Sequence, residues 1–137
     1  MSVDGQVVGQ TPFGLLVYLG VAAGDGAADI EYIVNKVRDL RIFEDADGKM
    51  NRSVVDAGGG LLVISQFTLS GDVRKGRRPS FDKAEKPDTA RGRYEEVLDA
   101  FRATGLPVAS GVFQAHMHVA SVNDGPVTIL LDSTRLF

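Results

Sequence analysis

Cysteine is absent from this chain of 137 residues. Its absence excludes a disulfide framework, a thiolate metal site and a cysteine nucleophile. Long apolar runs are absent as well, because the longest stretches, at 14–21, 60–64 and 127–131, fall far short of the roughly 20 residues that span a bilayer. Residues 1–5 have neither the basic nor the apolar region of a signal peptide. We therefore expect a cytoplasmic protein that does not enter a membrane.

Glycine-rich nucleotide loops are also missing, and histidine is scarce. The one glycine run, at 58–60, precedes an expected strand instead of following one and opening a helix, which excludes the nucleotide-binding fingerprints. The two histidines, His116 and His118, lie two positions apart in an expected strand, so both side chains point to one face. Such a pair can bind a metal ion, but no third ligand stands at a useful spacing. We interpret both as surface or dimer-face residues and expect neither a metal nor a cofactor.

The charge is distributed unevenly along the chain. The net charge of −3 argues against a general nucleic-acid coat. Between Val73 and Arg93, however, eight basic residues stand against three acidic ones, so this segment carries +5 and the remainder −8. A basic patch on an acidic body would bind a phosphate backbone while the remainder repels other polyanions. A solvated charged loop explains the same pattern equally well on charge alone.

Apolar periodicity predicts two helices among several strands. Helical spacing marks the stretches 30–40 and 94–101, and Asp25 or Asp29 is available as the N-cap of the first. Apolar runs predict strands at 14–21, 61–68, 108–113, 116–122 and 127–131. The last three follow one another so closely that they suggest an antiparallel meander.

These elements, with an apolar content of 44%, indicate one packed domain over 1–137. Strands and helices do not alternate regularly in this prediction. The expected fold class is therefore α+β, a compact single domain with a mainly antiparallel sheet and two main helices.

Two polar segments stand out from these patterns. In Ser65-Gln66-Phe67-Thr68-Leu69, hydrogen-bonding side chains crowd the end of an apolar strand, where they must be paired or face a ligand because burying them bare costs a few kcal/mol each. The segment Asn123-Asp124-Gly125-Pro126-Val127-Thr128 is typical of a hairpin turn. A Gly-Pro bond can also be cis, and glycine leaves its carbonyl uncovered, so presenting carbonyls to a ligand is the second, less favoured interpretation of the turn. The residues alone leave both interpretations open.

The same two segments resemble, in order and separation, the two signature motifs of the D-aminoacyl-tRNA deacylases. The resemblance covers nearly the whole chain and extends through Asp47-Gly48-Lys49-Met50-Asn51, Lys75-Gly76-Arg77-Arg78-Pro79-Ser80-Phe81 and Phe113-Gln114-Ala115-His116-Met117. It implies a compact α+β fold and a homodimer with two active sites at its interface. Each site would combine the strand end of one subunit with the Gly-Pro turn of the other, its peptide bond in cis.

The resemblance implies hydrolysis of the ester that joins a D-amino acid, or glycine on a non-cognate tRNA, to the terminal adenosine of tRNA. The carbonyls of the turn would hold the amino group of the substrate, and the rigid turn would exclude an L side chain. The implied catalytic residues are Ser65, Gln66, Phe67 and Thr68; the implied substrate-binding residues are Gly125, Pro126, Asn123 and Met117. The implied contacts to tRNA phosphates are Arg74, Lys75, Arg77 and Arg78.

Two mechanisms are open for such a site. In both, backbone amides near Phe67 and Thr68 would stabilise the developing oxyanion. Thr68 could attack as a nucleophile, but its hydroxyl would then need a base, and none is visible. In the second mechanism the neighbouring ribose hydroxyl helps to activate water while the protein positions the ester. We favour the second.

The chain departs from the family pattern at three places. The family usually carries a further strand ahead of the position of Met1, and its absence would leave a sheet edge open. Glu85 stands beside the pocket where a small residue is common, and Gln114 replaces a small residue ahead of Ala115.

Three other functions are compatible with the residues. A non-catalytic RNA-binding module that keeps the fold is favoured by the missing strand and Glu85. A related deacylase that removes an L amino acid would carry a trans bond at Gly125–Pro126. Metal-dependent hydrolysis through His116 and His118 would be sensitive to chelators.

Overall fold

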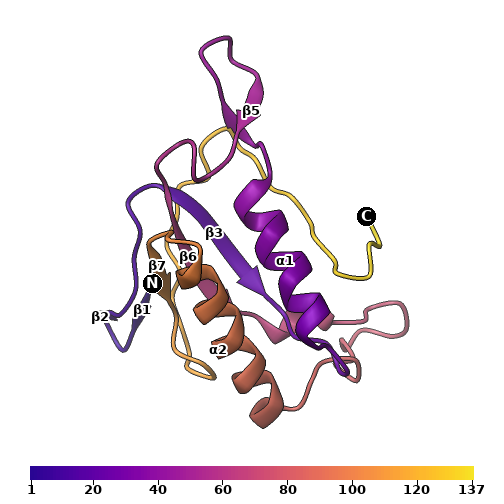
Figure 1. The fold of residues 1–137 in the computed structure, drawn as a ribbon. Helices are drawn as coiled ribbons and strands as arrows, with labels where there is room; N and C mark the ends of the chain where they lie inside the picture. Colours follow the sequence, from indigo (N-terminus) through magenta and orange to yellow (C-terminus); the bar gives the residue numbers. More distant parts are fainter.

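The computed structural model describes all residues from Met1 to Phe137, and they form one domain (Figure 1). Two α-helices are present, α1 at Ala27–Asp39 and α2 at Pro87–Ala103, with a short 3-10 helix, η1, at Phe67–Ser70. The strands are β1 (Ser2–Val3), β2 (Gln6–Val7), β3 (Gly14–Leu19), β4 (Phe43–Glu44), β5 (Met50–Arg52), β6 (Gly60–Ser65) and β7 (Val108–Ser110). Both predicted helices and the two long predicted strands are confirmed. No helix of the structure is both long enough and apolar enough to cross a bilayer.

The central sheet has the strand order β3-β6-β7 and is parallel throughout. Antiparallel pairing is confined to the short pairs β1–β2 and β4–β5, apart from isolated bridges. The prediction of a mainly antiparallel sheet was therefore wrong. The physical reason is the connections: α1 lies in the chain between β3 and β6, and α2 between β6 and β7, and a crossover through a helix returns the chain in parallel.

The C-terminal quarter contains less regular structure than its pattern suggests. Of the three strands expected there, only Val108–Ser110 forms, and the predicted meander is wrong. A single antiparallel bridge joins Ser2 to His118. From Val119 to Leu131 no residue takes part in a backbone–backbone hydrogen bond. Apolar alternation marks an extended chain, but it does not supply the neighbouring strand that a ladder needs.

Local chemistry explains where the helices begin and end. The N-cap of α1 is Gly26, whose N–H donates to the carboxylate of Asp29 at 2.8 Å, so neither aspartate expected as the cap occupies that position. Asp29 acts instead from the first turn, where a carboxylate favours the helix dipole. Pro87 opens α2 at a position that needs no N–H donor. Gly105, with φ +86°, follows the end of α2 in the left-handed conformation that favours glycine.

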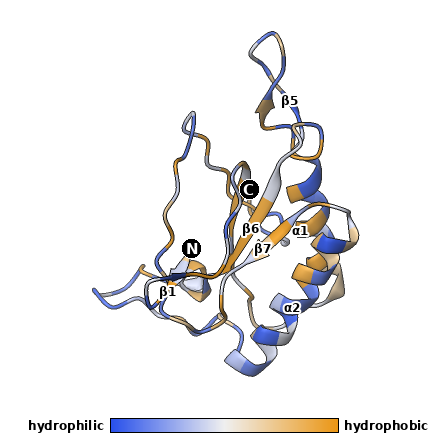
Figure 2. Cartoon of the chain, turned by 90° about the vertical axis from the view of Figure 1, so that its left-hand side faces the viewer, coloured by the Kyte–Doolittle hydropathy of each residue, from blue (hydrophilic) through white to orange (hydrophobic).

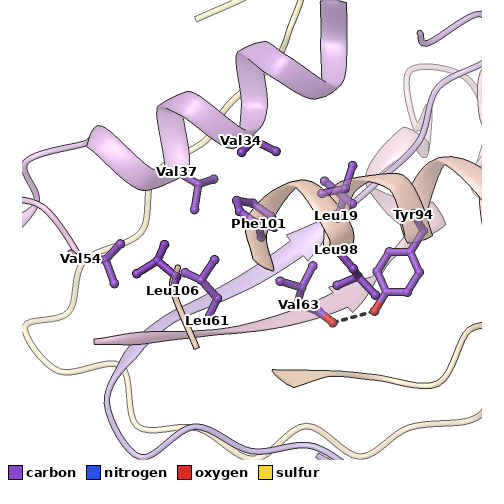
Figure 3. Close-up of a cluster of buried hydrophobic side chains, with 11 residues drawn as sticks. Leu19, Val34, Val37, Val54, Leu61, Val63, Tyr94, Leu98, Phe101 and Leu106 are labelled. Carbon is purple, nitrogen blue, oxygen red and sulfur yellow. Dashed lines mark hydrogen bonds between the residues drawn. The ribbon is translucent and has the colours of Figure 1, made fainter. Parts of the chain in front are cut away.

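The main core lies between the sheet and the two helices (Figure 3). Leu61 and Val63 of β6 point to the helices and are fully buried, while Leu62 and Ile64 point to the other face. On the helix side, Phe101 is fully buried, and the hydroxyl of Tyr94 donates to the carbonyl of Val63 at 2.8 Å. Figure 2 shows both helices on one side of the sheet. The opposite face has only a small cluster built from the N-terminus and the segment around residue 117.

Candidate active site

The first motif lies at the carboxyl end of the parallel sheet. Ser65 is the last residue of β6, and Gln66 leads directly into η1. The Gln66 N–H donates to the carbonyl of Leu19 at the end of β3, at 2.8 Å, which fixes where the chain leaves the sheet. Open parallel sheets bind ligands at this edge. The antiparallel sheet expected from the sequence would not have indicated it.

Two backbone amides at the start of η1 are free. The N–H groups of Phe67 and Thr68 donate to no acceptor in the chain. The next amide, that of Leu69, donates back to the carbonyl of Gln66 at 3.2 Å, and that of Gly71 to the carbonyl of Thr68 at 3.0 Å. The first N–H groups of any helix lack internal partners and can bind a negatively charged oxygen. This turn therefore offers two adjacent donors at an exposed position.

The hydroxyl of Thr68 has one hydrogen-bond partner, the side-chain amide of Gln66. The Nε2 of Gln66 donates in this bond, so this group does not take a proton from the hydroxyl. No carboxylate, imidazole or amine is bonded to Thr68. The arrangement therefore provides no base for a threonine nucleophile.

Several apolar side chains of η1 and of the loop that follows it are exposed. The ring of Phe67 is 58% exposed and has one aromatic neighbour, Phe81, at a centroid distance of 5.0 Å and an angle of 67°. Leu69 of η1 and Val73 in the following loop are exposed as well. Phe81 belongs to one of the segments that resemble the family, but the sequence indicates no role for it.

The second motif forms an exposed turn with an internal brace. The Gly125–Pro126 peptide is cis, and Gly125 has φ +134°. The side chain of Asn123 spans the turn: its Oδ1 accepts the N–H of Val127 at 3.0 Å, and its Nδ2 donates to the hydroxyl of Thr128 at 3.0 Å. The cis geometry expected from the family resemblance is present, and the trans geometry of the L-specific alternative is not. No hydrogen bond joins this turn to the first motif of the same chain.

The basic loop is closed at its base. Asp72 and Ser80 exchange two backbone hydrogen bonds, at 2.7 and 2.9 Å, on either side of residues 73–79. The guanidinium of Arg74 donates to the carboxylate of Asp72, with Nε–Oδ1 at 2.9 Å, and this donor holds the pKa of Asp72 well below its ordinary value. Three of the four cations expected to meet phosphate form no ion pair and are exposed: Lys75, Arg77 and Arg78. Arg74 already has an acidic partner within the chain.

The histidine pair lies on the surface. The rings of His116 and His118 have a centroid distance of 5.2 Å, and both residues are exposed. No group of three or more His, Cys, Asp or Glu side chains is arranged to hold a metal ion. Between the histidines, Met117 packs into the small cluster with Leu62 and Ile64, on the sheet face that carries no helix.

Two of the three departures from the family pattern, Glu85 and Gln114, are single residues, and both have hydrogen-bond partners in the chain. The carboxylate of Glu85 accepts the N–H of Gly24 at 3.3 Å and that of Lys86 at 2.9 Å. Gln114 has φ +63°, a conformation that favours glycine, and its side chain accepts a hydrogen bond from Arg91 at 3.3 Å. Both side chains therefore serve local hydrogen bonding.

Comparison with known proteins decides the family. Residues 1–132 match the sequence model of the family described as D-Tyr-tRNA(Tyr) deacylase. The chain belongs to this family. A D-aminoacyl-tRNA deacylase of Alkaliphilus metalliredigens (strain QYMF) is 55% identical over 137 residues, which make up all of this chain and 92% of that protein. A protein of the same name from Anaeromyxobacter dehalogenans (strain 2CP-C) is 58% identical, with the same coverage of each chain.

Two solved structures share the fold of this chain. The structure titled "c-Myc DNA Unwinding Element Binding Protein" superposes with a TM-score of 0.90 at 38% identity, covering 96% of this chain and 89% of that one. A probable eukaryotic D-amino acid tRNA deacylase superposes with a TM-score of 0.57 at 16% identity, covering 74% of each chain. The second similarity supports the fold alone.

Proposed function

We propose that this protein hydrolyses the ester bond of D-aminoacyl-tRNA in the cytoplasm and releases the free D-amino acid and the tRNA. Curated relatives more than half identical over the full chain carry the name of this activity. The observation that carries the proposal is the pair of free amides of Phe67 and Thr68 on the first signature motif. Glycine attached to a non-cognate tRNA is a second substrate of the same site, because it has no side chain to exclude.

In this proposal the amides stabilise charge during attack by water. Water adds to the ester carbonyl carbon, and the negative charge that develops on the carbonyl oxygen is bound by the N–H groups of Phe67 and Thr68. The carbon–oxygen bond to the ribose then breaks, and the ribose oxygen leaves with a proton. The neighbouring ribose hydroxyl helps to activate the water. The Gln66 donor on the Thr68 hydroxyl supports this route over a threonine nucleophile.

Chiral selection is assigned to the second motif. The carbonyls of Gly125 and Pro126 accept hydrogen bonds from the substrate amino group, and the backbone of the turn excludes an L side chain. Asn123 supports this role because its amide braces the turn on both sides. Met117 lines the same site.

The proposed active form is a homodimer in which Gly125–Pro126 of the partner subunit meets Ser65–Thr68. Residues 121–126 are exposed, and the backbone from Val119 to Leu131 forms no hydrogen bond to other backbone groups; its one bond within the chain joins the Val127 N–H to the side chain of Asn123. Buried backbone groups need hydrogen-bond partners, and an extended segment of this length with exposed apolar side chains is suited to an interface.

The basic loop is assigned to tRNA binding. Lys75, Arg77 and Arg78 contact the phosphates of the acceptor end, with Arg74 held beside them by Asp72. Replacing the three free cations with glutamine should weaken tRNA binding and flatten its salt dependence by about three counterions. An unchanged salt slope contradicts this assignment.

A deacylation assay with D-tyrosyl-tRNA, and the L ester as control, tests the activity. Phe67→Pro removes one of the two free N–H groups, whereas Phe67→Ala keeps it and loses only the ring. Losing one oxyanion donor lowers rates by about a hundredfold to a thousandfold, so we expect the proline variant to be far less active than the alanine variant. Thr68→Ala should keep much of the activity. Near-total loss in a folded Thr68→Ala protein would support the nucleophilic route instead.

Subunit mixing tests the shared site. Gly125→Val should inactivate the turn, because a side chain at φ +134° is strained and would contact Val127. In a mixed dimer of Phe67→Pro and Gly125→Val subunits, one site combines an intact η1 with an intact turn. We expect mixing of the two inactive proteins to restore activity. No restoration, despite formation of mixed dimers, contradicts the cross-subunit site.

A further inference from the structure

The amides of η1 need support from outside the helix. A four-residue 3-10 helix has few internal hydrogen bonds and poor bond geometry, so its orientation depends on what packs against it. The side chains of η1 are largely exposed, and only Ser70 is half-buried. Phe81, which lies outside η1, packs beside both of its ends.

The ring of Phe81 lies against the first residue of η1 and against the residue that follows its last one. At the first end it packs edge-to-face on Phe67, with centroids 5.0 Å apart. At the other end, its Cε1 lies 3.2 Å from the point where a Cβ on Gly71 would stand. The ring therefore packs against Phe67 and leaves no free space for a side chain at Gly71, so a rotation of η1 would disturb its packing at both ends.

The backbone of Phe81 is held independently of η1. Ser80 exchanges two hydrogen bonds with Asp72 at the base of the basic loop, and the carbonyl of Phe81 accepts the N–H of Ala84 at 3.0 Å. The adjoining Glu85 N–H donates to the carbonyl of Val21, just beyond β3, at 2.9 Å. These hydrogen bonds hold the backbone around Phe81 in place relative to the sheet.

Gly71 shows how closely η1 and this ring approach. Its φ of −62° and ψ of 124° are open to any residue, so its backbone does not require glycine. Space is tight, however: a Cβ there would stand 3.0 Å from the carbonyl oxygen of Thr68 and 3.2 Å from the ring of Phe81, so these neighbours would have to shift. On the other side, a Cβ on Gly20 would stand 3.2 Å from the carbonyl oxygen of Gln66 and 3.2 Å from Cβ of Leu69. The turn is therefore packed closely between β3 and Phe81.

We propose that Phe81 is a positioning residue that orients the amides of Phe67 and Thr68 toward the reacting carbonyl oxygen. The inference rests on the proposed deacylase activity and adds a residue that does not itself touch the substrate. Preorganised donors act only when they point at the position of the oxyanion, and misplacement by about 1 Å costs up to a hundredfold in rate.

The test compares Phe81→Ala with a matched control. The pair Phe13–Phe43 has the same edge-to-face form, with centroids 5.6 Å apart, and Phe43 is half-buried like Phe81 but lies at the β4–β5 hairpin. Single-turnover hydrolysis of D-tyrosyl-tRNA, tRNA affinity and the thermal midpoint are measured for the wild type, Phe81→Ala and Phe43→Ala. Phe81→Leu and Gly71→Ala are included, because they disturb the same contact more gently if Phe81→Ala does not fold.

We expect Phe81→Ala to lower the single-turnover rate constant by about tenfold to a hundredfold while tRNA affinity changes by less than about twofold. Phe81→Leu should recover part of the rate, and the N–H resonances of Phe67 and Thr68 should shift in the Phe81 variants but not in Phe43→Ala. A wild type without deacylase activity overturns the proposed function, and this inference with it. An active wild type with an unchanged rate in folded Phe81→Ala, or in Phe81→Leu and Gly71→Ala, overturns this inference alone. So does an equal loss in Phe43→Ala.

Discussion

The two faces of the central sheet differ in how many buried side chains cover them. On the helix face, Leu61 and Val63 are fully buried among side chains from α1 and α2. On the other face, the cluster is small, and the chain that continues from it at Val119 forms no backbone–backbone hydrogen bond up to Leu131, which packs on the main core. This difference indicates that the folding stability comes from the contacts on the helix-covered face. The proposed substrate-binding turn belongs to the half with few stabilising contacts, where local opening costs the least.

The largest expected effect is in the helix-covered core. Phe101 is fully buried between α2 and the sheet, so Phe101→Ala leaves a cavity and should lower the free energy of unfolding by about 3–5 kcal/mol. Urea denaturation followed by circular dichroism measures this. A loss below about 1 kcal/mol would show that the two halves of the molecule do not differ as described.

A substitution in the extended C-terminal segment should weaken dimer association and leave the folding stability of the subunit unchanged. Leu130 is 64% exposed in the extended segment, so Leu130→Asp should leave the stability of the isolated subunit nearly unchanged. If this segment forms the proposed interface, the same change should raise the dimer dissociation constant at least about tenfold, because burial of a leucine contributes about 1.5–3 kcal/mol. Sedimentation velocity over a range of concentrations measures it, and an unaltered dimer would place the interface elsewhere.

A smaller effect is expected at the buried hydroxyl of Tyr94. Its partner, the carbonyl of Val63, also accepts the N–H of Gly111 at 3.1 Å and so keeps one bond in Tyr94→Phe. The loss should be about 1 kcal/mol at neutral pH.

Burial also raises the pKa of Tyr94. The unfolded chain therefore ionises first as pH rises, and stability falls above the ordinary tyrosine pKa of about 10. This part of the alkaline loss should be smaller in Tyr94→Phe. Unfolding curves between about pH 8 and pH 11 measure it, and parallel curves for the two proteins would contradict the assigned cause.

The smallest effect on stability is expected at Gln114, ahead of the extended C-terminal segment. Its φ of +63° is costly for a residue with a side chain, and glycine removes that cost while making the unfolded chain more flexible. The net result of Gln114→Gly should be a gain of about 0.5 kcal/mol, since the exposed bond to Arg91 contributes little. Thermal unfolding measures it, and a lower midpoint would show that the Arg91 contact is the stronger term.

Several elements were accessible from the sequence. The helical spacing of apolar residues located both helices, because side chains three and four positions apart share one face of a helix. The run at 61–68 marked the strand whose end carries the first motif. The two signature motifs were sufficient to indicate the family, which the comparisons confirm.

Other features were not accessible. The sheet is parallel because two helices cross between its strands, and apolar periodicity within each strand carries no information about its direction. The pattern after residue 116 predicted strands where none form, because a ladder needs a neighbour and this chain offers one only at His118. The ion pair of Arg74 with Asp72 likewise depends on the closure of a loop.

The sequence by itself determined the two helices, the two long strands, the family and the cis-prone turn, because these depend on the chemistry of neighbouring residues. The tertiary structure alone decided the parallel sheet, the two free amides at its carboxyl edge and the packing of Phe81 on the ring of Phe67. These depend on which distant segments share space, and pairing and packing energies act between residues that lie far apart along the chain.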